Sequence, residues 1–145
     1  MGARLQYAKV LDQYFFYREG GRVHPGLPNK VVIPHYGGPA AAFLVLRAWS
    51  DDHGTFTEQW RIEGPDGAIV YQSVPREIHM PTRSHTERLQ DEVSDLDLGA
   101  VEGVYRAIFS LDDYEVARVD FPVQLSEAAL GGQRKSGDPP DGEPI

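Results

Sequence analysis

Two pairs of adjacent aspartates are the most suggestive candidates for chemistry in this sequence. They are Asp51 with Asp52 and Asp112 with Asp113. If the segments around Trp60 and Tyr105 share a β-sheet, the turns that carry the two pairs lie at the same end of the fold. Carboxylate oxygens are preferred ligands of Ca²⁺, so the four aspartates are candidate metal ligands, with calcium as the ion. The alternative is that they are ordinary turn residues, because an Asp side chain bonds nearby backbone.

A cationic stretch between residues 76 and 88 is the second candidate. The residues that could contact an anion or a partner are Arg76, His79, Arg83, His85 and Arg88. Guanidinium and imidazole groups together can hold a phosphate or carboxylate, or dock an acidic partner. Glu77 and Glu87 lower the net charge of the stretch, so a solvent-exposed sheet edge of mixed charge is the alternative interpretation.

Motifs of the common catalytic sites do not occur in this sequence. It contains no Gly-x-Ser-x-Gly, no His-Glu-x-x-His and no glycine-rich phosphate loop before a helix. His79 and His85 are separated by Pro81, and their spacing fixes no shared ligand geometry. We therefore expect a protein that is not an enzyme. A hydrolase without a recognisable motif, its activity dependent on His79 or His85, remains a third hypothesis.

Residues 96–109 are predicted to organise the elements that position these groups. They are typical of a strand end, a tight corner and a strand with a tyrosine near its start, which is the pattern of a tyrosine corner in a β-sandwich. Tyr105 would bond the corner backbone while its ring joins the core. Gly103 supplies the conformational freedom of the bend. An ordinary strand aromatic is the alternative role for Tyr105.

Other apolar patterns predict the strands around this corner. Residues 42–50 are apolar on both faces, as in a central strand. Residues 56–63 alternate so that Trp60 faces inward, where sandwich folds often place a core tryptophan. A β-turn over residues 64–67 follows, in which Gly67 takes the strained position, and residues 114–125 predict a half-buried last strand.

The first 41 residues and residues 74–88 are harder to place. The aromatic run Tyr14–Tyr17, followed by Gly20 and Gly21, predicts an opening hairpin, although residues 1–11 also fit a short helix. Residues 22–41 are rich in proline and predict a loop with a short edge strand at 30–33. This loop either wraps the sandwich or is functional. Residues 74–88 predict a polar, protected edge.

Composition limits the classes of function. The chain has 145 residues, no cysteine and a formal net charge of −8. Absence of cysteine excludes a disulfide scaffold and thiolate zinc sites. The negative charge argues against nucleic acid or an anionic membrane as a partner. We expect a cytoplasmic protein with one β-sandwich domain over residues 1–125 and a disordered tail over 126–145.

These patterns resemble those of small bacterial β-sandwich domains that have no assigned function. The residues that carry the resemblance are Tyr14–Tyr17, 43–49, 62–67 and 103–105. More loosely, the chain is similar to immunoglobulin-like and fibronectin-type modules without their cysteine pair. The resemblance implies an all-β fold, an antiparallel, immunoglobulin-like β-sandwich of about 7 to 9 strands. It implies no catalytic residue.

The first functional hypothesis is therefore a non-enzymatic binding or protein-interaction module. It would act on another protein or on a second copy of the chain, through loops or an exposed sheet edge, with no cofactor. The second hypothesis is a calcium-binding or small-ligand-binding domain that uses the aspartate-rich end. The double variant Asp51→Asn with Asp113→Asn distinguishes the two hypotheses. If the second is right, the protein binds calcium and the double variant loses that affinity.

Overall fold

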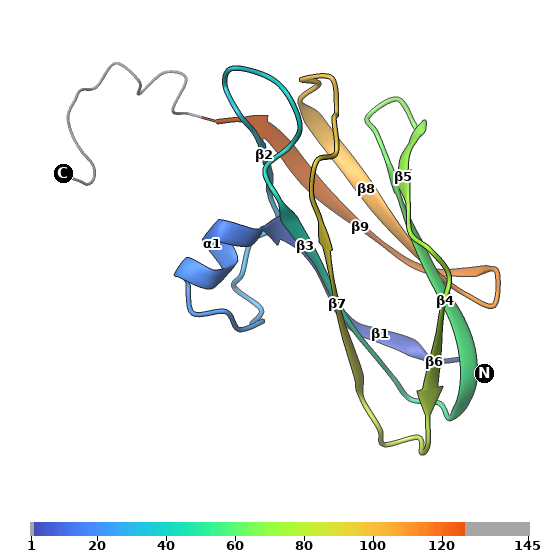
Figure 1. The fold of residues 1–145 in the computed structure, drawn as a ribbon. Helices are drawn as coiled ribbons and strands as arrows, with labels where there is room; N and C mark the ends of the chain where they lie inside the picture. Colours follow the sequence, from blue (N-terminus) through green and yellow to red (C-terminus); the bar gives the residue numbers. More distant parts are fainter. Residues whose placement is uncertain (1, 127–145) are drawn as a thin grey trace.

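The computed structural model describes residues 2–126, which form two β-sheets and one short helix (Figure 1). In chain order the elements are β1 (Arg4–Asp12), α1 (Gln13–Arg18), β2 (Val31–Ile33), β3 (Phe43–Ser50), β4 (Gly54–Glu63), β5 (Ile69–Gln72), β6 (Arg76–Met80), β7 (Glu87–Val93), β8 (Gly103–Leu111) and β9 (Tyr114–Leu125). The prediction of an all-β chain with two sheets is confirmed.

One sheet has three strands in the order β1-β3-β7, and the other has six. The six-stranded sheet follows the order β2-β9-β8-β4-β5, and β6 also pairs with β4. The strands that carry Trp60 and Tyr105 thus share a sheet with β9, as the sequence predicts. The pairs are antiparallel except that β2 runs parallel to β9, which corrects the expectation of a wholly antiparallel fold.

The main core lies between the two sheets. β3 is buried along its whole length, which fits the predicted central strand. Trp60 on β4 and Tyr105 on β8 are each 2% exposed, and both belong to the main core cluster. Apolar packing between the sheets therefore stabilises the fold without a disulfide.

The predicted opening hairpin is wrong, because the aromatic run lies in α1. Asp12 ends β1 and caps the helix, its Oδ2 accepting a hydrogen bond from the N–H of Phe15 at 2.8 Å. At the other end the N–H of Gly21 donates to the carbonyl oxygen of Phe16 at 2.9 Å, and Gly21 has a φ of 69°. Local capping thus overrides the strand preference of the aromatic residues.

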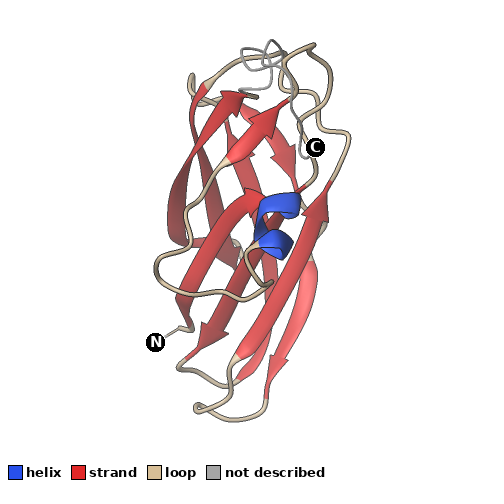
Figure 2. Ribbon diagram, turned by 90° about the vertical axis from the view of Figure 1, so that its left-hand side faces the viewer, coloured by secondary structure: helices blue, strands red, loops and turns tan. Residues whose placement is uncertain are grey.

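A second, smaller core lies on the outer face of the three-stranded sheet. Figure 2 shows α1 lying over this face. Phe16 of α1 and Leu27 of the following loop cluster with Leu11, Leu44 and Leu46 of the sheet. Part of the proline-rich loop therefore wraps the sheet, as one of the two predicted roles requires.

The segment over residues 74–88 is more ordered than its polar sequence suggests. It contains β6, which pairs with β4, and the first residues of β7. Ile78 and Met80 alternate with exposed neighbours and are buried in the main core. The prediction of a purely polar edge is therefore wrong, since this short alternation is a strand signal.

The corner before β8 contains the hydrogen bond that the sequence predicts for Tyr105. Its hydroxyl donates to the carbonyl oxygen of Val101 at 2.6 Å. Glycine is required at position 103, where φ is +144° and a Cβ would lie 2.9 Å from Cγ of Pro65. Gly67 takes a φ of +87° in the predicted turn, where its N–H bonds the carbonyl oxygen of Gly64 at 2.9 Å.

Tyr105→Phe keeps the ring and removes only the hydroxyl, so it is expected to destabilise the fold by about 1 kcal/mol or more. Tyr114→Phe, at a tyrosine that is 77% exposed, is the matched control and should leave the free energy of unfolding unchanged. Urea unfolding followed by circular dichroism measures both. Equal midpoints for the two variants would contradict a stabilising role of the corner bond.

The same residue gives the fold a dependence on alkaline pH. Burial, followed by the charge of Asp66, raises the pKa of Tyr105 above its ordinary value. The folded state thus favours the neutral phenol, and this stabilisation is complete below pH about 10 and lost as the pH rises through the folded-state pKa. Tyr105→Phe should lack this contribution to the alkaline loss of stability.

The predicted tail lies outside the described residues apart from Ser126. No helix among residues 2–126 has the length and apolar character that crossing a bilayer requires.

Candidate functional site

The four aspartates proposed as calcium ligands do not form a metal site in the structure. Asp51 pairs with Arg4 at 2.8 Å, and Asp52 Oδ1 accepts a hydrogen bond from the N–H of His53 at 2.8 Å. Asp112 Oδ1 accepts the N–H of Thr57 at 2.8 Å. Asp51, Asp112 and Asp113 have positive φ, which marks them as turn residues. Within residues 2–126, no three His, Asp or Glu side chains are grouped to hold a metal ion.

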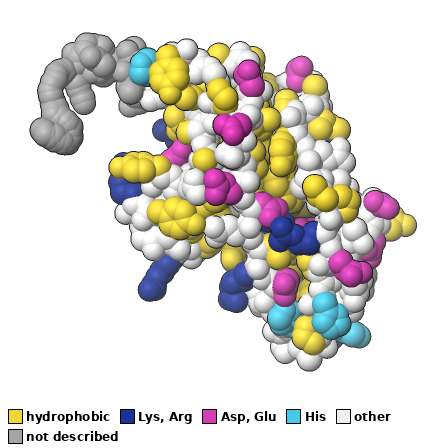
Figure 3. Space-filling view, viewed as in Figure 1, with side chains coloured by type: hydrophobic (Ala, Val, Ile, Leu, Met, Phe, Trp, Pro, Cys, Tyr) yellow, Lys and Arg dark blue, Asp and Glu magenta, His cyan; other side chains and the backbone are white. Residues whose placement is uncertain are grey.

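The cationic stretch does not form one anion site either. Four of its five members each bond a different side chain. The pairs are Arg76 with Asp91 at 2.7 Å, His79 with Thr55 at 3.2 Å, Arg83 with Asp52 at 3.6 Å and His85 with Glu87 at 2.7 Å. In Figure 3 the Lys and Arg side chains on this face are dispersed rather than gathered in one patch. Only Arg88 of the five lacks a described partner.

A buried charge network, which the sequence analysis missed, links the two sheets. Arg47 of β3 and Glu58 of β4 are each 1% exposed. Arg47 donates through Nε and Nη2 to the Glu58 carboxylate at 2.7 and 2.5 Å. Its Nη2 also lies 3.1 Å from Oδ2 of Asp91. An arginine in an otherwise apolar strand was the available signal, because a fully buried arginine requires an acidic partner.

Both core tryptophans donate to this network. The indole N–H of Trp49 bonds Glu58 at 2.7 Å, and that of Trp60 bonds Asp91 at 2.9 Å. Arg76 forms a further ion pair with Asp91. Because Arg47 and Glu58 are buried and pair with each other, we interpret the network as structural.

The outer face of the three-stranded sheet offers a different environment. Strand register arranges its side chains in three rows, which are Leu11–Leu44–Glu92, Lys9–Leu46–Gln90 and Tyr7–Ala48–Arg88. From α1, Gln13 bonds Glu92 at 3.1 Å and Tyr17 bonds Gln90 at 3.0 Å. The helix and its loop therefore cover the first two rows, and no such bond from α1 reaches the third.

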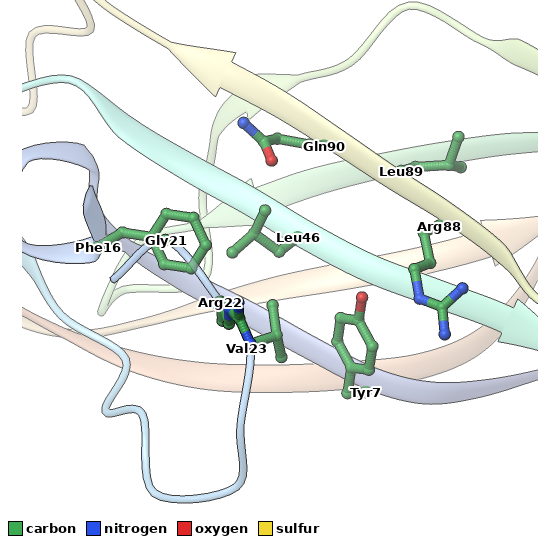
Figure 4. Close-up of a pocket in the computed structure, with 9 residues that line it drawn as sticks. All are labelled: Tyr7, Phe16, Gly21, Arg22, Val23, Leu46, Arg88, Leu89 and Gln90. Carbon is green, nitrogen blue, oxygen red and sulfur yellow. The ribbon is translucent and has the colours of Figure 1, made fainter. Parts of the chain in front are cut away.

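A groove of 480 Å³ opens where this cover ends (Figure 4). It is lined by Tyr7, Phe16, Gly21, Arg22, Val23, Leu46, Arg88, Leu89 and Gln90. Apolar and polar groups contribute about equally to this lining. In Figure 4 Tyr7 lies between Arg88 on one side and Arg22 with Val23 on the other. The groove thus combines an apolar surface with two separated guanidinium groups.

These two arginines differ from the others that the structure describes. Each of the others has an ion pair with an acidic side chain, and these are Arg4, Arg18, Arg47, Arg61, Arg76, Arg83, Arg106 and Arg118. Arg22 and Arg88 have no acidic partner within residues 2–126, and both line the same groove. Arg88 belongs to the cationic stretch that the sequence predicts, whereas Arg22 joins the groove only through the fold of residues 19–29.

A hollow of similar size, 510 Å³, lies along β8 and β9. Its charged lining residue is Glu102, and that carboxylate already accepts the N–H of Leu125 at 2.7 Å. The groove beside Arg22 and Arg88 is therefore the stronger candidate for a binding site.

Comparison with known proteins does not assign the chain to a family. No protein-family model matches the sequence, and no curated protein matches it. Among solved structures, the chain is similar to Pseudomonas fluorescens alkylpurine DNA glycosylase AlkC bound to DNA containing an abasic site analog, with a TM-score of 0.49 and 8% identity over 84% of this chain and 30% of that chain. It is also similar to the periplasmic chaperone SfaE, with a TM-score of 0.44 and 13% identity over 68% of this chain and 55% of that chain. The chain thus spans less than two thirds of either protein, and similarities at this level assign neither a site nor an activity.

Proposed function

We propose that this chain is a non-enzymatic protein-interaction domain that binds another protein through the groove beside Arg22 and Arg88. The observation that carries the proposal is that the two arginines without an acidic partner in the described part of the chain line one groove. An unpaired guanidinium can form a charge-assisted hydrogen bond with a partner. The binding surface then combines the outer face of the three-stranded sheet, its edge strand β7 included, with residues 21–23 of the loop after α1.

The residue types around the groove support a protein as the partner. Arginine and tyrosine are enriched among the residues that dominate interface energies. Arg22, Arg88 and Tyr7 line the groove, and Tyr17 borders it through its bond to Gln90. Tyr17 is 53% exposed, so a partner seated in the groove can also contact α1.

We also propose an immunoglobulin-like strand order for the domain. If β1, β3, β4, β7, β8 and β9 correspond to strands A, B, C, E, F and G, the neighbours A-B-E and C-F-G of that fold are preserved. Trp60 then lies on strand C, and Tyr105 lies near the start of strand F. This order supports a binding module only in general terms, because the sandwich hosts many functions.

Photocrosslinking at the groove tests the proposed function. The photoreactive residue p-benzoylphenylalanine replaces Tyr7, which lines the groove, or Tyr114, which is exposed on β9 of the other sheet. In cells of the source organism, we expect one adduct of defined mass from position 7 and not from position 114. Arg22→Glu with Arg88→Glu should remove that adduct. The proposal is overturned if no adduct is specific to position 7, or if the adduct persists in the double variant.

A further inference from the structure

We propose that the groove binds an acidic peptide segment, in which two carboxylates flank one apolar side chain. This inference rests on the proposed function and names the chemical class of the partner. The carboxylates would meet Arg22 and Arg88, and the apolar side chain would pack on the lining between them.

Charge selects the acidic class. The chain has a formal net charge of −8, so its overall field repels anions. An acidic segment can therefore be attracted only to cations that have no acidic partner nearby. In the described part of the chain, both arginines of the groove meet this condition. A basic segment would instead place its charges beside these two guanidinium groups.

The separation of the arginines favours two carboxylates over a single phosphate. A phosphate site brings several donors onto one anion. Here the two arginines come from different elements, the loop after α1 and strand β7, and Figure 4 shows them on opposite sides of Tyr7. Each guanidinium is thus positioned for its own carboxylate, since its planar fork matches that group in a bidentate manner.

The surface between the arginines suits an apolar side chain. In Figure 4, Tyr7 and Val23 lie there, and both are half-buried against the small outer core. Phe16 and Leu46 are already buried, so a partner side chain would pack on the half-buried side chains of Tyr7 and Val23. The hydroxyl of Tyr7 has no hydrogen-bond partner among residues 2–126, so it can bond the peptide backbone of the partner.

Selection from an unbiased peptide library on the full chain tests the inference. We expect the selected peptides to be enriched in pairs of Asp or Glu around a large apolar residue. Arg22→Gln and Arg88→Gln should each weaken the binding of a selected peptide about tenfold. Arg118→Gln, on the opposite sheet, is the matched control and should leave the affinity unchanged. Equal unfolding midpoints of the variants would show that the loss of affinity does not arise from unfolding.

Substitutions in the peptide provide the reciprocal test. Changing either acidic residue to its amide should weaken binding to the wild-type protein but not to the variant that lacks the facing arginine. Inorganic phosphate serves as a competitor. Displacement of the peptide at low phosphate concentrations would overturn the carboxylate assignment in favour of a phosphate site.

The outcomes separate this inference from the proposed function. If neutral or basic peptides are selected and their binding depends on Tyr7 and Val23, the acidic class is wrong but the groove remains a protein-binding site. If no selected peptide depends on any groove residue, and the crosslinking experiment yields no adduct specific to position 7, both proposals are wrong.

Discussion

Glu58→Gln is expected to destabilise the fold by about 3 to 5 kcal/mol, because it removes the acidic partner of a buried arginine. Arg47 is 1% exposed and makes two hydrogen bonds to the Glu58 carboxylate. The amide of glutamine keeps the size of the side chain but not its charge. Asp91, at 3.1 Å, then remains the only described carboxylate that pairs with Arg47. Chemical denaturation followed by circular dichroism gives the free energy of unfolding.

An exposed pair provides the control for this prediction. Arg106 and Asp120 form an ion pair at 2.9 Å with side chains 42% and 57% exposed. Asp120→Asn should therefore cost at most about 1 kcal/mol. The double variant Arg47→Met with Glu58→Leu should recover most of the stability lost in Glu58→Gln, because it removes both buried charges. A loss in Glu58→Gln no larger than that of the control would contradict the structural role of the network.

Trp60→Ala is expected to cost about 3 to 5 kcal/mol, from the apolar surface removed and the cavity left in the main core. Trp60 is 2% exposed, and its ring stacks on Tyr71 with the centroids 5.3 Å apart. The substitution also removes the indole N–H that Asp91 accepts at 2.9 Å. Trp60→Phe should be less destabilising, because it keeps an aromatic ring and loses mainly the hydrogen bond.

Val74→Ala serves as the control for the tryptophan variants. Val74 is 83% exposed, so its truncation should change the free energy of unfolding by no more than about 0.5 kcal/mol. Thermal and urea unfolding should rank the three variants in the same order. If Trp60→Ala were as stable as Val74→Ala, the tryptophan would not be a central residue of the core.

The two charged regions of the protein have opposite roles for one physical reason. In the network between the sheets, the buried Arg47 and Glu58 and the half-buried Asp91 pair with one another, so none of them is free to bind a partner. In the groove, Arg22 and Arg88 are exposed and have no acidic partner within residues 2–126. Variants of the network should therefore change stability, whereas variants of the groove should change binding.

Periodicity predicted the strands that form the main core. The apolar run of β3, the inward-facing Trp60 and the corner at Tyr105 follow from residue types a few positions apart, and strands with one buried face must show such patterns. The same reasoning failed for α1, because the Asp12 cap and the glycines after the helix outweigh the β-propensity of Tyr14–Tyr17. Ile78 and Met80 of β6 were missed because the alternation there is short.

The candidate site was only partly accessible from the sequence. The cationic stretch contained Arg88, but its other members have described partners. The aspartate pairs lie in turns. Arg22 lies 66 positions before Arg88 in the sequence. No local pattern connects them, since their common position depends on how the segment 13–29 packs on the sheet.

By itself, the sequence determined that this is an all-β chain with a corner at Tyr105 and a tryptophan-centred core. These features depend on alternation, turn chemistry and burial, which act over short distances along the chain. Only the tertiary structure decided which charges are neutralised and which remain open. Ion pairing depends on distances between residues remote in sequence, and those distances are set by strand register and by the packing of the two sheets.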